Sequence, residues 1–248
     1  MTMRVAVAGA TGNIGRLAAA ALRVQHEVVE ISRSRGVDLV TADGLDAALE
    51  GVNAVIDTMS YEGADREAAE KYFGTATENL LAAENRAGVR HHILLSIVGV
   101  DRVKGNAHYY GKRMQEDIVN KGQVPWTILR ATQFHDFAAT MVDWSEQDGV
   151  AAIPPLLVQP IAPQDVADVL AELATGTPQG LYRDLAGPEP QDLVDMARRT
   201  NAARGRSIRL LPTWSSVLGV EMAGNVLLPG EDARIAPTTF DEWLALQE

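Results

Sequence analysis

The feature that most constrains this fold is a glycine-rich loop that begins at the ninth residue. The segment Val5-Ala-Val-Ala-Gly9-Ala-Thr-Gly12-Asn-Ile-Gly15 leads from an apolar strand pattern into a helical one. Gly9 allows a tight turn out of the strand, Gly12 lets the backbone approach a pyrophosphate, and Gly15 lets the helix pack closely on the strand. The N–H groups at the helix start would face that anion. We therefore predict a dinucleotide-binding loop formed by Gly9, Thr11, Gly12, Asn13, Ile14 and Gly15.

Strand and helix patterns alternate through the first half of the chain, which is typical of parallel βαβ units. A helix is expected after the loop, with further helices along the apolar stripe 73–87 and over 108–121. Gly88 and Gly122 predict where the last two of these helices end. This alternation indicates an α/β fold with a doubly wound parallel sheet of the Rossmann type. The expected strands are 4–8, 27–31, 37–41, 54–58, 91–96 and 126–129.

The pattern becomes less regular after about residue 132, where prolines punctuate a loop-rich region. An amphipathic helix around 166–173 and a second helix near 191–203 are expected there, with strand-like segments at 181–185 and 208–211. We predict an NAD(P)-binding Rossmann domain at 1–132 and a small mixed C-terminal lobe at 133–248. The lobe is expected to be partly integrated with the first domain and to lie across the strand ends, where open α/β sheets bind ligands.

Composition argues against several classes of function. The 248 residues include no cysteine, which excludes disulfides and thiolate chemistry, and no spacing typical of a metal site is present. The formal net charge of −11 disfavours direct binding to nucleic acid or to anionic membranes. No stretch approaches the roughly 18 apolar residues of a membrane span, and the N-terminus does not resemble a signal peptide. We expect a cytoplasmic protein that acts on a small molecule.

The end of the second predicted strand bears on the choice between NAD and NADP. An NAD-type site commonly places an acid there to bind the ribose 2′-hydroxyl, and Glu30 is a candidate, although it lies before the strand end. Ser32, Arg33 and Arg35 occupy that end, where a hydroxyl and guanidinium groups suit the 2′-phosphate of NADP. An ordinary solvated basic turn is the alternative. The sequence favours NADP and leaves NAD open; Thr58, at the end of strand 54–58, is also assigned to the cofactor site.

Several further segments follow in a fixed order. They are the arginine after the second strand, Leu95-Ser-Ile-Val-Gly99, Tyr109-Tyr-Gly-Lys112, Trp126-Thr-Ile-Leu-Arg-Ala-Thr-Gln-Phe134 and Val158-Gln-Pro-Ile-Ala-Pro-Gln-Asp-Val-Ala167. Together with the glycine loop, this set resembles the NmrA-like atypical short-chain dehydrogenase/reductases as far as about residue 170. The resemblance implies bound NAD(P) and a substrate cleft between the sheet's carboxyl edge and the lobe. That family includes reductases of quinones and other small carbonyl or unsaturated compounds, and also cofactor-binding regulators without turnover.

Hydride transfer to a carbonyl is assisted by a proton donor and by stabilisation of the developing oxyanion. In short-chain dehydrogenases the donor tyrosine precedes a lysine by four residues. Here His108 stands at that position, and Tyr109 lies three residues before Lys112. Residues three and four apart share a helix face, so Tyr109 and Lys112 can still converge, and His108 could itself donate a proton near neutral pH. The candidate catalytic residues are Ser96, His108, Tyr109 and Lys112, and Lys112 is also expected to bind the cofactor.

Each of these assignments has a structural alternative. Tyr109 could shape the pocket, Lys112 could be a solvated helix lysine, and Ser96 could cap a loop. The residues after the sixth strand are expected to line the nicotinamide or substrate pocket, although a structural role is the more common one for His135. These pocket residues are Gln133, Phe134, His135 and Phe137.

The leading hypothesis is an NADP-dependent reductase of a small apolar carbonyl, quinone or enone. The alternative is a cofactor-binding redox sensor or regulator, which the displaced tyrosine and the acidic surface both fit. A sugar-nucleotide epimerase or dehydratase would need the four-residue Tyr–Lys spacing and a larger C-terminal domain, and neither is evident in the sequence.

Overall fold

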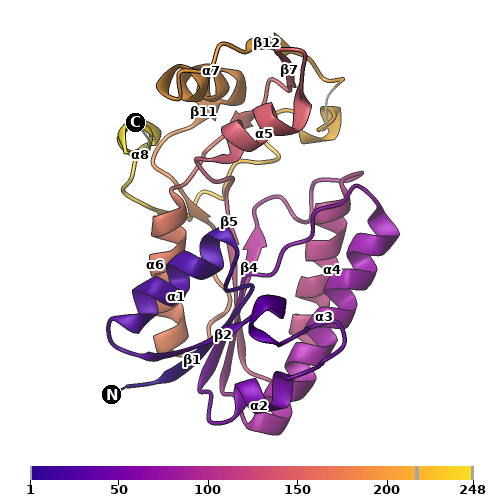
Figure 1. Cartoon of the computed structure of the whole chain (residues 1–248), viewed down its shortest axis with the longest axis vertical. Helices are drawn as coiled ribbons and strands as arrows, with labels where there is room; N and C mark the ends of the chain where they lie inside the picture. Colours follow the sequence, from indigo (N-terminus) through magenta and orange to yellow (C-terminus); the bar gives the residue numbers. More distant parts are fainter. Residues whose placement is uncertain (1, 216–217, 247–248) are drawn as a thin grey trace.

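A parallel sheet forms the centre of the molecule. The computed structural model describes residues 2–215 and 218–246 (Figure 1). The sheet has eight strands in the order β13-β10-β5-β4-β3-β1-β2, and β9 pairs with β5 off this path. The neighbouring strands run parallel. Their bounds are β1 Arg4–Ala8, β2 Glu27–Ile31, β3 Ala54–Asp57, β4 His91–Ile97, β5 Trp126–Ala131, β9 Gly180–Leu181, β10 Leu185–Ala186 and β13 Arg234–Ile235.

Helices cover both faces of this sheet, so successive side chains of a strand enter different cores. On one face, Val5 and Val7 pack with α1 (Asn13–Arg23) and α6 (Pro163–Thr175). On the other face, Ala6 and Ala8 pack with α2 (Leu45–Leu49) and α3 (Arg66–Ala87), beside α4 (Ala107–Lys121). The predicted doubly wound α/β fold is confirmed. As predicted, α3 ends at Gly88, which has a φ of 71°, and α4 ends before Gly122.

The predicted strand at 37–41 is wrong, because this segment forms a turn. The Asp38 carboxylate accepts hydrogen bonds from the backbone N–H groups of Val40 at 2.7 Å and Thr41 at 3.3 Å. Gly36, just before the turn, has a φ of 78°. A short polar side chain thus satisfies the donors that a strand would have paired with β2. Within the described residues, β2 is an edge strand of the sheet.

The C-terminal lobe lies above the carboxyl ends of the central strands (Figure 1). Its core gathers Met141, Ile153, Leu193, Met196 and Phe240. The chain also returns from the lobe to the main sheet, because α6, β10 and β13 all pack there. The division at residue 132 therefore stays a prediction. The lobe's elements are α5 Phe137–Ser145, β6 Glu146–Gln147, β7 Val150–Ile153, β8 Leu157–Val158, β11 Gln191–Asp192, α7 Leu193–Ala203, β12 Arg209–Pro212 and α8 Phe240–Ala245.

No helix in the part of the chain that the structure describes is long and apolar enough to cross a membrane. No group of three or more metal-binding side chains occurs within residues 2–215 and 218–246.

Candidate functional site

The glycine loop joins β1 to α1 at the carboxyl edge of the sheet. Gly9 has a φ of 77°, which only glycine adopts without strain, and its N–H donates to the Ile31 carbonyl at 3.1 Å. A Cβ on Gly15 would lie 2.2 Å from the Gly9 carbonyl oxygen, so this glycine is required for the helix to approach the strand. Gly12 is exposed and begins α1 without a side-chain cap. The first N–H groups of α1 therefore stay open to an anion.

Two side chains fix this loop in place. The Thr58 hydroxyl donates to the Ala8 carbonyl at 2.8 Å, which ties the end of β3 to the end of β1 beneath the loop. The Asn13 amide donates to Asp136 at 2.6 Å and links the start of α1 to the start of α5. Thr58 thus supports the loop through its hydroxyl, and Asn13 connects it to the C-terminal lobe. Thr11 is exposed in the loop and Ile14 is buried beneath it.

The basic segment after β2 contains two arginines, of which Arg35 forms an ion pair and Arg33 does not. Glu30 forms ion pairs with Arg23 and with Arg35, the latter at 2.7 Å, and the hydrogen bond from Arg23 together with the two positive charges lowers the pKa of that carboxyl. The side chain of Arg33 is exposed and makes no ion pair or hydrogen bond with any other described residue. The Ser32 hydroxyl contacts that of Ser34 at 3.1 Å. Of the two arginines that follow β2, Arg33 is therefore the one whose side chain is free to meet a phosphate.

Lys112 is buried at the point where β3 and β4 end. Its ammonium donates to the carbonyls of Met59 at 3.0 Å and Leu95 at 2.9 Å, and to Gln115 Oε1 at 2.9 Å. Only 5% of the residue is exposed. Burial lowers the pKa of Lys112 to about 8, although Asp57 and Glu116 act in the opposite direction. All three ammonium protons are used, and Lys112 holds two strand ends together.

A buried acid lies behind this lysine. The Gln115 amide donates to Asp57 Oδ2 at 2.7 Å while its oxygen accepts from Lys112. Asp57 also accepts from the Met59 N–H at 2.9 Å. Asp57 and Gln115 are both fully buried. The chain from carboxylate to amide to ammonium fixes the orientation of Lys112, and the sequence analysis did not identify either partner.

Tyr109 and His108 lie on α4 but in different surroundings. The Tyr109 hydroxyl accepts a hydrogen bond from the Gln133 amide at 3.3 Å, and its ring packs in the core of the lobe. Burial raises the pKa of Tyr109 above its usual range. The His108 ring meets Phe73 edge-on at 5.8 Å, and burial lowers the pKa of His108 to about 4. Both side chains are therefore neutral at pH 7.

Two of the candidate residues carry a buried polar atom without a hydrogen-bond partner among the described residues. They are the hydroxyl of Ser96, near the end of β4, and the Oε1 atom of Gln133. Ser96 and Gln133 are 5% and 6% exposed, so neither is open to bulk water. Buried polar atoms without partners are uncommon and often mark functional positions.

The remaining predicted pocket residues have structural surroundings. His135 is 1% exposed, bonds the Thr238 carbonyl at 3.2 Å, and contacts the rings of Phe240 and Trp243. Phe134 packs against the sheet's first core, and Phe137 packs against the core of the lobe. Of the four residues, Gln133 is the one that bonds a candidate catalytic group.

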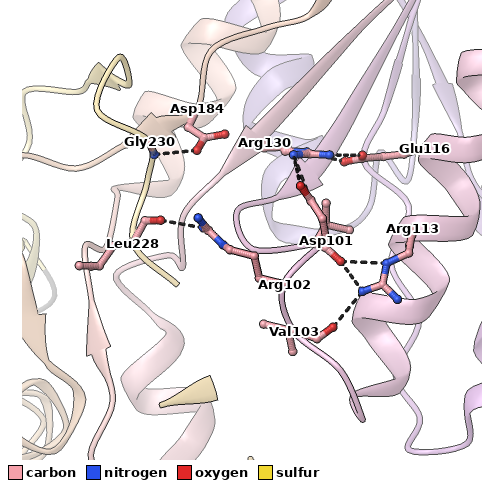
Figure 2. Close-up of polar contacts among 10 residues, drawn as sticks. Asp101, Arg102, Val103, Arg113, Glu116, Arg130, Asp184, Leu228 and Gly230 are labelled. Atoms are coloured by element: carbon pink, nitrogen blue, oxygen red, sulfur yellow. Dashed lines mark hydrogen bonds and ion pairs between the residues drawn. The ribbon is translucent and has the colours of Figure 1, made fainter. Parts of the chain in front are cut away.

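The loop between Ser96 and Tyr109 is clamped from two sides (Figure 2). On one side, the Arg130 guanidinium on β5 pairs with Glu116 at 2.7 Å and with Asp101 at 3.1 Å. Arg113 donates to the carbonyls of Val100 and Val103. These contacts attach the loop to β5 and α4, and so set the start of the helix that carries the candidate catalytic residues.

The other side of the loop meets the C-terminal segment. Arg102 donates to the Leu228 carbonyl at 2.9 Å, and the neighbouring Gly230 N–H donates to Asp184 at 2.9 Å (Figure 2). Gly99 has a φ of 84°, and a Cβ there would lie 2.5 Å from the Val226 carbonyl oxygen. The contacts of Arg102 and Gly99 with this segment are not predictable from sequence spacing, because they join residues more than 100 positions apart.

Comparison with known proteins assigns the chain at the level of a family. The model of a family described as NAD(P)H-binding matches residues 9–177. No curated protein sequence matches the chain closely enough to count as a relative.

Solved structures share this fold over most of the chain. A dTDP-4-dehydrorhamnose reductase from Bacillus anthracis, in complex with NADP, has a TM-score of 0.77 at 14% identity, covering 99% of this chain and 98% of that one. An NADPH-dependent quinone oxidoreductase from Escherichia coli has a TM-score of 0.70 at 16% identity, covering 98% and 99%. A Thermus thermophilus UDP-glucose 4-epimerase with NAD has a TM-score of 0.69 at 16% identity, covering 85% and 86%. These likenesses establish the fold.

Proposed function

This chain belongs to the NAD(P)H-binding family, and on that basis we propose that it is an NADPH-dependent reductase of a small apolar carbonyl, quinone or enone. The membership confirms the predicted nicotinamide dinucleotide cofactor. The observation that carries the reductase proposal is the unpaired, buried Ser96 hydroxyl near the carboxyl end of β4, on the strand whose Leu95 carbonyl binds Lys112. It is a donor without an acceptor among the described residues, at the sheet edge where ligands of this fold bind.

Different residues would bind the cofactor and orient the substrate. Gly9, Gly12 and Gly15 would hold the pyrophosphate at the start of α1. Lys112 would bind the nicotinamide ribose by exchanging a carbonyl acceptor for a ribose hydroxyl. The bound nicotinamide supplies the hydride, while Ser96 donates a hydrogen bond to the substrate oxygen and stabilises its developing charge.

The properties of Tyr109 favour one kind of substrate. Burial raises the pKa of its hydroxyl, and this outweighs the hydrogen bond from Gln133, which acts in the opposite direction, so Tyr109 is a weak general acid. Quinones and enones place the developing charge on a stabilised enolate or phenolate oxygen, to which solvent can deliver the proton. The fold is shared with a quinone oxidoreductase along nearly the whole chain, which supports this substrate class.

The preference for NADPH rests on Arg33. Arg35 forms an ion pair with Glu30 at 2.7 Å. Because Glu30 also pairs with Arg23, its carboxylate is poorly suited to bind the ribose of NAD. Arg33 and Ser32 would take the 2′-phosphate, because Arg33 is exposed and without an ion pair among the described residues.

A cofactor-binding redox regulator is the second candidate. It is favoured by the saturation of Lys112, whose three protons all go to protein acceptors, and by the engagement of the Tyr109 hydroxyl. A protein that only senses the cofactor needs neither group to be free.

An activity panel separates the two candidates. NADPH oxidation would be followed with quinones, enones, aldehydes and ketones, using wild type, Ser96→Ala and, as a matched control, Ser145→Ala. The Ser145 hydroxyl donates to the Met141 carbonyl within α5. We expect turnover with quinones or enones, lowered about tenfold or more by Ser96→Ala, as for loss of one oxyanion donor. Tight NADPH binding without turnover of any compound would favour the regulator.

A further inference from the structure

We propose that a groove on the C-terminal lobe, between α7 and the strand β12, binds a small amphipathic organic carboxylate. The groove has a volume of about 450 Å³, within the range of small-molecule sites. Figure 1 places α7 and β12 at the end of the lobe farthest from the main sheet. None of the residues that line it belongs to the glycine loop or to the proposed catalytic group.

The polar side chains of the groove are hydrogen-bond donors. Arg198, Asn201, Arg206 and Ser207 line it, and no acidic side chain does. Asn201 is 5% exposed, and its Nδ2 has no hydrogen-bond partner among the described residues. A buried amide donor without an acceptor is costly, so an acceptor supplied by a ligand would stabilise it. The donor set therefore favours an anion.

The segment that supplies most of the groove's lining is basic, although the chain as a whole is acidic. Residues 198–209 contain five arginines and no aspartate or glutamate, whereas the chain has a formal net charge of −11. Arg198 pairs with Asp195 and Arg206 pairs with Asp143, and the side chains of these pairs are exposed or half-exposed. Ion pairs of this kind contribute little free energy, so a ligand carboxylate can replace them.

The floor of the groove is apolar. Val194, Ile208 and Leu210 line it, and all three are half-buried against the core of the lobe. A hydrocarbon body can cover these side chains while its carboxylate meets the Arg198 and Arg206 guanidinium groups, which bind carboxylates through paired hydrogen bonds. A simple inorganic anion would use the donors and leave the apolar floor uncovered. The combination of guanidinium donors and apolar side chains therefore favours an organic carboxylate as the ligand.

Calorimetric titration of the full chain, saturated with NADPH to occupy the cofactor site, tests this. The probes are 4-phenylbutyrate, its neutral amide and inorganic phosphate. We expect saturable binding of the carboxylate, with the amide and phosphate each at least about tenfold weaker. Arg198→Met and Arg206→Met should each weaken the carboxylate by about ten- to a hundredfold. Arg209→Met, an exposed arginine of the same segment that does not line the groove, is the matched control and should leave binding unchanged.

Thermal unfolding of each variant, measured with and without phenylbutyrate, distinguishes loss of the ligand site from failure to fold. A folded Arg206→Met protein should lose the ligand-induced rise in Tm that the Arg209→Met protein retains. Failure of phenylbutyrate to bind, equal binding of the amide, or equal losses in Arg206→Met and Arg209→Met would overturn the proposal.

Discussion

Two glycines of the loop, Gly12 and Gly15, differ in what their missing side chains make room for. A Cβ on Gly12 would meet only the Gly9 carbonyl oxygen, at 3.2 Å, so the fold can accommodate it. The side chain would instead occupy the approach of the pyrophosphate. Gly12→Val should therefore abolish NADPH binding in a protein that still folds, as measured by fluorescence titration and thermal unfolding.

Gly15→Val is the contrasting variant. Its Cβ would lie 2.2 Å from the Gly9 carbonyl oxygen, so α1 would have to move away from β1. We expect Gly15→Val to lower the free energy of unfolding strongly. Unchanged NADPH affinity in folded Gly12→Val would remove the basis of the loop assignment.

Arg33 and Arg35 provide a matched pair for cofactor choice. Arg33→Ala should weaken NADPH binding by about ten- to a hundredfold, because a charge-assisted contact to the 2′-phosphate is lost, and should leave NADH binding nearly unchanged. Arg35→Ala should have a smaller effect on NADPH, since Arg35 already binds Glu30. Equal losses of NADPH and NADH affinity in Arg33→Ala would contradict the NADP preference.

Lys112 predicts a dependence of stability on pH. Burial lowers its pKa from 10.5 to about 8, so between these values the unfolded chain holds a proton that the folded chain has released. The free energy of unfolding then rises with pH across this window. Relative to Lys112→Met, the wild type should gain about 3 kcal/mol between pH 8 and 10.5. Urea unfolding at several pH values measures this, and a difference that stays flat would show that Lys112 keeps its ordinary pKa.

At the scale of elements, hydrophobic periodicity predicted the strands β1 to β5 and the helices α1, α3, α4 and α6 around the sheet, but not the short helix α2. It failed at residues 37–41, where Val37, Leu39 and Val40 suggest a strand but Asp38 closes a turn. It also missed α5, because Phe137–Ser145 follows directly on a segment predicted as pocket lining. Both failures come from local hydrogen bonding and tertiary packing, which periodicity does not contain.

The clamp around the 98–106 loop is an element-scale feature that mutation can test. Arg130→Met would leave Glu116, whose side chain is 7% exposed, without its cation. Loss of one partner of a buried ion pair costs about 3 kcal/mol, less here because Arg130 is partly exposed. Arg86→Met, which removes an exposed pair with Asp46, is the control and should cost less than about 0.5 kcal/mol.

The urea unfolding curves of the two variants give the comparison directly. The double variant Glu116→Gln with Arg130→Met should recover part of the loss, because no buried charge then remains unpaired. Equal effects of Arg130→Met and Arg86→Met would show that the clamp does not hold the loop.

At the scale of the whole molecule, the sheet and its loop could be predicted and the site could not. Gly9, Gly12 and Gly15 lie close together in the sequence, so the loop that they form can be predicted from the sequence alone. Two partners of Lys112 are Met59, which follows β3, and Leu95 on β4, and Gln133 meets Tyr109 across 24 positions. Such contacts depend on how the helices pack against the strand ends, which a sequence pattern does not specify.

Hydride transfer from NADPH to a small apolar acceptor can be followed with an isotope label. The protein is incubated with NADPH deuterated at the transferable position and a panel of enones, and mass spectrometry locates the label in the products. We predict that wild type places deuterium on the substrate carbon, that Ser96→Ala does so more slowly, and that Gly12→Val does not. Deuterated NADPH that binds tightly and leaves every product unlabelled would contradict the proposed hydride transfer.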